Sequence, residues 1–395
     1  MAITGIKIVT TDTVLGQPID VNTTSMIIAS DTGYLAGGSA MSGRSVADFA
    51  LLTDPFVQHC IELYFSEPAN SGRLLWVGNA STAEEIKSAI RATTVQSFDR
   101  RPRQIAFVTA LGADARAAFD PSTTQTILTS LATEGIRCVG VIAYIPLSDL
   151  GSGELDINTV IDGLEDATAL SAPFVGLCLP ISGWVQEDQN LEDFAYSDGA
   201  VNVISSLANI SVGTSIGDGG LAAVTEPFEI PIQDTGSDYH GTIDVRTLSL
   251  AQLDKLGEKG YLFTRKRAPR NGLWWNDGAT CNDPKNALST LEAARTICSM
   301  ADDLQSFFVP YINTRVPVTS TGDIQSTYKQ VVLDNARAAV VQKYIDNGDI
   351  SDARINLVAK DNDMIGTRTW EVTLSILPAT TLRWIDGYVF YVKNL

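Results

Sequence analysis

The feature that most constrains the fold is a regular alternation of short apolar runs with helical segments between residues 74 and 181. The apolar runs cover residues 74–77, 104–111, 137–144 and 174–181. One intervening helix opens near Pro121-Ser122, and another covers residues 156–170. Short apolar runs that alternate with helices predict βαβ units around a buried, mostly parallel sheet. We therefore expect an α/β domain over about residues 73–235.

The segment before this domain has a different pattern. Residues 1–30 are rich in β-forming apolar residues, residues 31–45 are rich in Gly and Ser, and apolar residues recur at helical spacing over residues 46–65. We expect residues 1–72 to form an N-terminal arm strand and a segment that packs with the C-terminal domain.

Residues 236–395 are expected to form an α+β domain with a terminal strand arm. Apolar side chains recur every three or four residues over 288–308 and over 324–344, which predicts two long amphipathic helices. Apolar and polar residues alternate over 368–377, which predicts a half-buried antiparallel strand. The fold class is therefore α/β plus α+β: an inserted α/β domain and a C-terminal domain that the N-terminal strand region and the terminal strand arms complete.

Apolar residues with β propensity lie at both ends of the chain. They are Ile3, Ile6, Ile8 and Val9 at the start, and Tyr388, Val389, Phe390, Tyr391 and Val392 at the end. Chain ends are usually polar and frayed, and unpaired strand edges are usually covered. These strands therefore either complete a sheet of their own chain or pair with a neighbouring chain by strand addition.

The formal net charge of −18 is distributed unevenly. Residues 1–72 carry 2 basic and 7 acidic residues, residues 73–235 carry 8 and 21, and residues 236–395 carry 18 and 18. So acidic a chain is unsuited to nucleic acid, because polyanion binding depends on basic contacts that release counterions. We expect a solvated acidic body in the middle of the chain and a balanced, self-associating region after it.

Redox chemistry and membrane insertion find little support in the sequence. The five cysteines are widely spaced and form no CxxC pair, which favours reduced, buried thiols. No apolar stretch is long enough for a membrane helix, and the N-terminus lacks the basic start and apolar block of a secretion signal. We expect a chain that folds in a cytoplasm without direct membrane insertion.

One motif supports an enzymatic alternative. The pentapeptide Gly213-Thr214-Ser215-Ile216-Gly217 matches the GxSxG pattern of hydrolases, in which Ser215 would be the nucleophile. His240, the sole downstream histidine, would be the base, with Asp218, Asp234 or Asp238 as its carboxylate. The following Asp-Gly-Gly is poor material for a helix start, so a serine hydrolase is our second hypothesis.

Cofactor and metal sites are not expected. The two histidines lie far apart in sequence, and no Cys/His cluster has metal-ligand spacing. No Lys or Arg follows the glycine-rich stretch as it would in a phosphate-binding loop.

The order of elements in the last third resembles the contractile tail sheath family of phages and phage-derived injection systems. A short helix with Gly (251–261) precedes a strand–turn segment with two tryptophans (262–281), a long helix (290–313) and a second helix. The chain closes with an Asn-containing strand (INLVAKDNDMIG), a strand that ends in Pro378 and an apolar terminal strand. Sheath proteins commonly carry a Trp-Gly-x-Arg-Thr-like stretch at the strand–turn position. Trp274-Trp275-Asn276-Asp277-Gly278 replaces it, so the chain resembles a divergent member.

The resemblance implies a structural protein without a cofactor. Subunits would stack as hexameric rings around an inner tube, with the terminal arms adding strands to neighbouring sheets. Contraction would drive the tube through a target envelope without nucleotide hydrolysis. The implied partners are further copies of the chain, the tube protein, and baseplate and terminator or cap proteins. The subunit would assemble in a bacterial cytoplasm as part of a phage tail or a related particle.

Two basic sets are candidate contact residues. Arg265, Lys266, Arg267 and Arg270 form the one basic cluster, which either docks on an acidic patch of a neighbour or makes ordinary surface ion pairs. By the same resemblance, Lys329, Arg337 and Lys343 on the second long helix are candidates for contact with the tube. A non-contractile virion or tail scaffold protein with the same β-rich ends is the third hypothesis.

Overall fold

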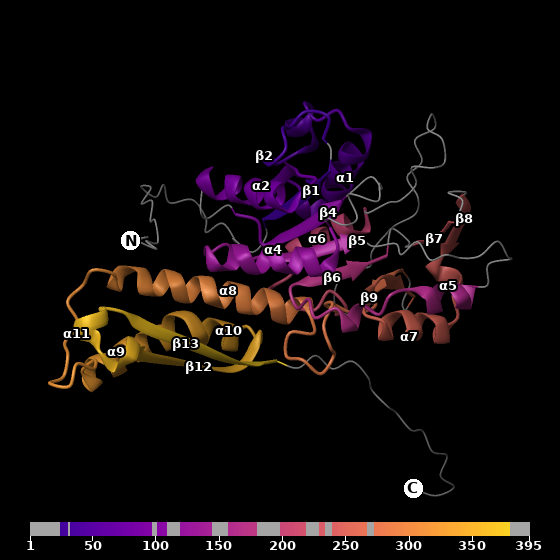
Figure 1. The fold of residues 1–395 in the computed structure, drawn as a ribbon. Coiled ribbons are helices and arrows are strands. Elements are labelled where there is room, and N and C mark those ends of the chain that lie inside the picture. The colour runs from indigo at the N-terminus through magenta and orange to yellow at the C-terminus, as the bar shows by residue number, and fades with distance from the viewer. Residues whose placement is uncertain are drawn as a thin grey trace, which may run out of the picture. The chain divides into compact units, whose positions relative to one another are not determined.

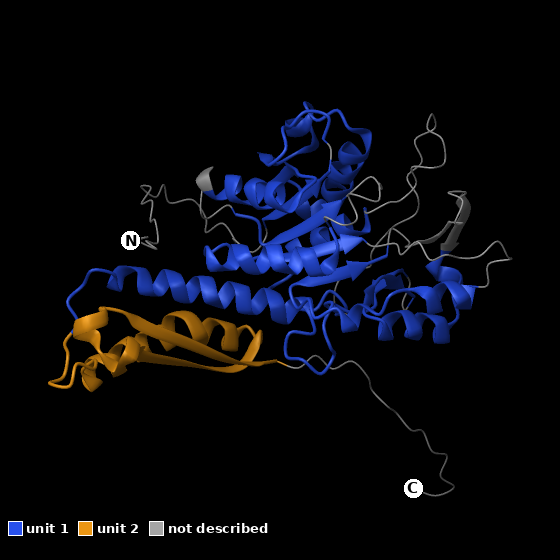
Figure 2. Cartoon of the chain, in the orientation of Figure 1, with its two compact units in different colours: residues 1–316 blue, residues 317–395 orange. Residues whose placement is uncertain are grey.

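In the computed structural model the chain divides into two compact units, unit 1 (residues 1–316) and unit 2 (residues 317–395) (Figure 1, Figure 2). The structure describes residues 24–30, 32–96, 101–108, 119–143, 157–179, 198–218, 229–233, 239–266 and 272–379.

Unit 1 is built on a seven-stranded sheet in the order β2-β3-β1-β4-β5-β6-β9. Its strands are β1 (Ser25–Ala29), β2 (Ser39–Gly43), β3 (Leu75–Asn79), β4 (Gln104–Val108), β5 (Val139–Ala143), β6 (Val175–Cys178) and β9 (Tyr261–Leu262). All neighbouring strands are parallel except β2, which is antiparallel to β3. Every residue of β1, β4, β5 and β6 is buried, as expected for strands that helices cover on both faces.

Helices form two layers around this sheet. In one layer α2 (Ala83–Gln96) packs on α4 (Pro121–Thr133), and in the other α1 (Pro55–Ser66) packs on α6 (Gly199–Ala208), which lies along β4 and β5 (Figure 1). The other helices in the described part of unit 1 are α5 (Ile157–Gly163), α7 (Leu250–Glu258) and α8 (Leu291–Phe308). The short strands are β7 (Glu229–Gln233) with β8 (Tyr239–Asp244), and β10 (Thr264–Arg265) with β11 (Trp274–Trp275).

Local signals explain where the helices begin. Asp54 accepts a hydrogen bond from the N–H of Val57 at 2.8 Å and Pro55 follows it, so α1 starts there. The predicted single helix over residues 46–65 is therefore a 3-10 turn (Val46–Phe49) followed by α1. Asp120 and Pro121 start α4 in the same way.

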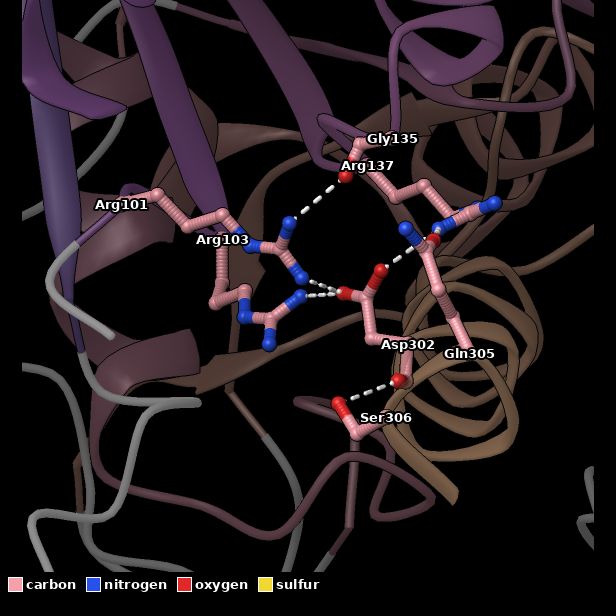
Figure 3. A network of polar contacts seen from close by, with 7 residues as sticks. All are labelled: Arg101, Arg103, Gly135, Arg137, Asp302, Gln305 and Ser306. Carbon is pink, nitrogen blue, oxygen red and sulfur yellow. Dashed lines mark hydrogen bonds and ion pairs between the residues drawn. The ribbon is translucent and has the colours of Figure 1, made fainter. Parts of the chain in front are cut away.

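A buried ion cluster ties α8 to the sheet (Figure 3). Arg101 and Arg103, at the start of β4, both contact Oδ2 of Asp302 on α8. Nη1 of Arg137, just before β5, contacts Oδ1 of Asp302 at 2.7 Å and donates to Oε1 of Gln305 at 2.8 Å. The side chain of Asp302 is 5% exposed. We call Arg101, Arg103, Arg137 and Asp302 the arginine cluster.

Unit 2 packs a continuous helix, which contains a π-helical segment, against a two-stranded ribbon. The helix runs through α9 (Ser326–Ala336), a π-helical segment (Arg337–Val341) and α10 (Gln342–Asp346). The ribbon pairs β12 (Ile350–Ala359) with β13 (Trp370–Pro378) in antiparallel fashion. A 3-10 turn (Lys360–Asn362) and α11 (Met364–Thr367) connect the two strands.

The predicted mixed α/β fold with a parallel sheet is confirmed, as are the two long helices and the strand over 368–377. The expected boundaries of the α/β domain, at residues 72/73 and 235/236, differ from the first and last residues of the seven-stranded sheet. β1 precedes the first boundary yet lies at the sheet's centre, and β9 follows the second yet forms its edge. The segment rich in Gly and Ser, residues 31–45, has the composition of a loop but contains β2. The assembly roles assigned to the three segments stay predictions.

Candidate assembly site

The β12–β13 ribbon is the candidate assembly site because it leaves strand edges open. Among the described residues it consists of these two strands alone, so each strand has one edge without a strand partner. An isolated two-stranded ribbon is marginally stable in water, and an open edge presents unpaired N–H and C=O groups to another chain. The geometry suits the addition of further strands.

The two faces of the ribbon differ in polarity. Opposite residues in the register share a face: Ala353 with Ile376, Ile355 with Leu374, Leu357 with Val372, and Ala359 with Trp370. This apolar face is covered by the helices on the β12 side, where Leu357 is fully buried. On β13 the same face is only half-buried. Leu377, near the end of β13, lies on the opposite face, across from Asp352, and is 60% exposed. Apolar surface is therefore left at the edge formed by β13.

The basic cluster of the strand–turn segment is described only in part. Arg265 pairs with Asp254 over 3.5 Å and is partly buried, and Lys266 is exposed. Arg267 and Arg270 lie outside the described residues. The docking role of this set stays a prediction.

The three basic residues of the second helix do not have the same environment. Arg337 lies in the π-helical segment, where Nη2 pairs with Asp352 at 2.9 Å and Nη1 donates to the carbonyl of Ala353 at 2.6 Å. Lys343 is exposed and lies 4.9 Å from the ring centre of Tyr344. Lys329 is half-buried. Arg337 thus joins the helix to β12, and contact of the three residues with a tube stays a prediction.

Of three comparisons with known proteins, only the comparison with solved structures finds a match. No protein-family model matches the sequence, and no curated protein matches it. The helical sheath of the anti-feeding prophage, in its contracted state, matches with a TM-score of 0.59 over 100% of both chains, at 12% identity. The contracted sheath complex of the extracellular contractile injection system PVC matches with a TM-score of 0.55 over 98% of this chain and 99% of that chain, at 12% identity. A tail sheath protein of Listeria innocua matches with a TM-score of 0.51 over 90% of this chain and 92% of that chain, at 11% identity.

The chain has the fold of contractile sheath proteins. The sheath resemblance, drawn from the order of elements in the last third, is thereby confirmed for the fold and extends over nearly the whole chain. The predicted arm residues at the two ends lie outside the described residues.

The GxSxG motif lies in a buried loop of this sheath fold. The side chain of Ser215 is 5% exposed, and its Oγ accepts a hydrogen bond from the N–H of Gly217 at 3.2 Å. A β-carbon added at Gly278 would lie 3.4 Å from that Oγ, so the loop packs tightly here. The side chain of His240 lies outside the described residues. Ser215 therefore has a packing role, and its Oγ does not stand exposed as that of a hydrolase nucleophile does.

Metal and thiol chemistry find no support in the described part of the chain. It holds no group of three or more His, Cys, Asp or Glu side chains that could bind a metal ion. All five cysteines are free and buried, as predicted. Burial raises the pKa of Cys138 to about 12 and that of Cys298 to about 11, so both thiols stay protonated at neutral pH. No described helix is long and apolar enough to cross a membrane.

Sequence reasoning missed the arginine cluster. Two signals could have indicated it: three of the four residues 100–103 are arginines, and Asp302 falls on the apolar side of a long amphipathic helix. A lone acid on a buried helix face calls for basic partners. The partners themselves come from strand starts that are distant in sequence, and no local pattern identifies those.

Proposed function

We propose that this chain is the sheath subunit of a contractile phage-tail-like injection machine. The observation that carries the proposal is the match over the full length of both chains to the contracted sheath of the anti-feeding prophage. A fold alone does not establish a function, so the open edges of the β12–β13 ribbon add the second support. A helical polymer needs such self-complementary connections.

In the proposed polymer, the terminal arms of neighbouring subunits add strands to the ribbon. The start of the chain would supply Ile3 to Val9 and its end Tyr388 to Val392, and each would pair with an open edge. Strand addition gains main-chain hydrogen bonds, and the apolar side chains of the added strand extend the half-buried apolar face of β13. Because a backbone ladder holds only the strand, the domains on either side can rotate as rigid bodies while the connection persists.

The proposed architecture has two layers. Residues 236–395, with balanced charge, form the packed inner layer together with the arms, and the acidic segment 73–235 forms the solvated outer layer. Subunits stack as hexameric rings around an inner tube, with baseplate and cap proteins at the ends. Contraction runs downhill from a metastable extended state, so the subunit needs no enzymatic activity and hydrolyses no nucleotide. The polymer assembles in a bacterial cytoplasm as part of a phage tail or a related particle.

Negative-stain electron microscopy of the purified chain tests this proposal. We expect striated hollow tubes or stacked rings from the full-length chain, and no such polymers after deletion of residues 386–395. A control keeps the tail length but scrambles the order of these ten residues, which removes the specific pairing without shortening the chain. Ordered polymers from the truncated chain would rule out strand addition by the C-terminal arm.

The hydrolase alternative is tested separately with a fluorophosphonate probe. We expect neither labelling of the wild-type chain nor any effect of Ser215→Ala on polymer formation. Labelling that disappears in Ser215→Ala would instead support a hydrolase and count against a purely structural role.

A further inference from the structure

The arginine cluster brings three guanidinium groups to one carboxylate, that of Asp302. The side chain of Arg101 is 2% exposed, that of Arg103 11% and that of Arg137 24%. Buried charges are stable when they are paired, and like charges a few ångströms apart repel each other strongly away from water. Arg137, the most exposed of the three, is also repelled by the nearby charge of Arg101.

Arg137 is the member at the edge of the cluster (Figure 3). All of its contacts among the described residues pass through Nη1, which it shares between Asp302 and Gln305. Its Nε and Nη2 make no hydrogen bond to any described residue, and this side chain is the most exposed of the three. These two nitrogens form the fork that binds a planar oxyanion with two parallel hydrogen bonds.

The rest of the cluster keeps Arg137 in place. Gln305 and Asp302 hold Nη1, and Arg101 donates to the carbonyl of Gly135, two residues before Arg137, at 2.6 Å. Burial and the nearby charge of Arg101 lower the pKa of Arg137, although a guanidinium stays protonated at any physiological pH. An additional negative charge at the open fork would offset that repulsion.

We propose that the Nε–Nη2 fork of Arg137 is a binding site for one small oxyanion, a carboxylate or a phosphate. The anion offsets the repulsion between Arg137 and Arg101 and so stabilises the attachment of α8 to the sheet. The same chemistry is offered by a free oxyanion in solution and by an Asp or Glu side chain of a second copy.

The first experiment uses the dilute, unassembled chain, so it does not depend on the proposed sheath function. Thermal unfolding is followed as inorganic phosphate replaces chloride at constant ionic strength. We expect a saturable rise of the unfolding midpoint in the wild type, and a roughly tenfold or greater loss of phosphate affinity in Arg137→Gln. Arg354→Gln, which removes an exposed arginine of β12, is the matched control and should keep the wild-type response.

A further variant keeps the test decisive if Arg137→Gln folds poorly. Arg137→Lys retains the charge but lacks the fork, so its phosphate affinity should also fall. An identical phosphate response in the wild type, Arg137→Gln and Arg137→Lys would overturn the proposal, because the stabilisation would then be a general salt effect.

Assembled particles distinguish the two sources of the anion. If a carboxylate of a second copy occupies the fork, polymers bind no radiolabelled phosphate at this site, and phosphate raises the concentration needed for assembly. If the anion comes from solution, pelleted polymers retain labelled phosphate in the wild type and lose it in Arg137→Gln. Failure of the chain to polymerise would count against the sheath function and leave the result on the dilute chain intact.

Discussion

Unit 1 and unit 2 differ in how much of their β-structure is covered by other elements of the same unit. The sheet of unit 1 has seven strands, four of them wholly buried, and one of its two edges is the two-residue strand β9. The ribbon of unit 2 has two strands among the described residues, and its apolar face is only half covered along β13. Unit 1 has the properties of a finished domain, whereas unit 2 has those of a domain that other strands complete. The proposed polymer needs a domain that is complete by itself and a domain that pairs with strands of neighbouring subunits.

The largest effect should come from breaking the arginine cluster in unit 1. Asp302→Asn leaves three guanidinium groups without the carboxylate that joins them. We expect it to lower the free energy of unfolding by about 3–5 kcal/mol, since removal of one partner leaves buried charges uncompensated. Urea unfolding followed by tryptophan fluorescence measures the loss.

Asp334→Asn is the control for that experiment. Asp334 is exposed on α9 and accepts a hydrogen bond from Gln330 at 2.8 Å, so its loss should change stability by no more than about 0.5 kcal/mol. Equal effects of the two variants would mean that the cluster does not stabilise unit 1.

A matched pair of core truncations sharpens the comparison between the units. Ile27 in β1 and Leu357 in β12 are both fully buried. Each truncation to alanine should cost about 2–5 kcal/mol, with Ile27→Ala near the upper end, because neighbours on both faces of the sheet cannot collapse into the cavity. Leu357→Ala should lie near the lower end, since the open ribbon can relax.

Chemical denaturation of both variants, with a probe in each unit, measures the two costs. A larger cost for Leu357→Ala than for Ile27→Ala would show that the ribbon is as rigidly packed as the sheet. That result would count against an unfinished unit 2.

The difference between the units also explains how far the sequence predicts this fold. Buried parallel strands give continuous apolar runs. The local sequence pattern therefore predicts strands β3 to β6 and most of the helices that connect them. β1 has an apolar run too, but its place at the centre of the sheet depends on crossovers that periodicity does not encode. The helix α6 was missed because the sequence around it is rich in Gly, Ser and acidic residues before it becomes apolar.

Candidate sites were less predictable than the elements that bear them. The alternation of Trp370, Val372, Leu374 and Ile376 correctly indicated the strand β13. Whether a further strand pairs with the edge of β13 depends on which other strands join the sheet. The local sequence pattern does not show this. For Arg337, the family resemblance predicted contact with a tube. Tertiary structure pairs it with Asp352, a partner that the sequence pattern did not indicate, and the tube contact stays a prediction.

An exposed apolar residue on the ribbon separates monomer stability from assembly. Leu377 is 60% exposed near the end of β13. Leu377→Lys should change the free energy of unfolding by no more than about 0.5 kcal/mol in the dilute chain, because little is buried there. In the proposed polymer an added strand covers this region, so the same change should prevent ordered assembly in electron micrographs.

Leu250→Lys is the control for surface charge. Leu250 is 68% exposed on α7 of unit 1, and we expect its variant to form normal polymers. Assembly of both variants, or loss of assembly in both, would remove the special role assigned to β13.

The smallest effect should come from the exposed ion pair that joins the helix of unit 2 to its ribbon. The hydrogen bond from Arg337, with that from the N–H of Ala353, lowers the pKa of Asp352 below its ordinary value. A carboxylate with a folded-state pKa below its unfolded one adds stability above the unfolded pKa and loses it as pH falls through the folded pKa. The pair should therefore stabilise unit 2 at neutral pH and lose this effect below about pH 4.

Because many other carboxylates titrate in the same range, the informative quantity is a difference between two proteins. The stability of the wild type minus that of Arg337→Gln should be small and positive at pH 7, should fall on acidification, and should fall with added salt, since the pair is exposed. A difference that is constant from pH 7 to pH 3 would assign the effect of Arg337 to its hydrogen bond with the carbonyl of Ala353. In that case the helix and the ribbon are joined through the backbone, and the ribbon would keep its attachment under conditions that neutralise surface charge.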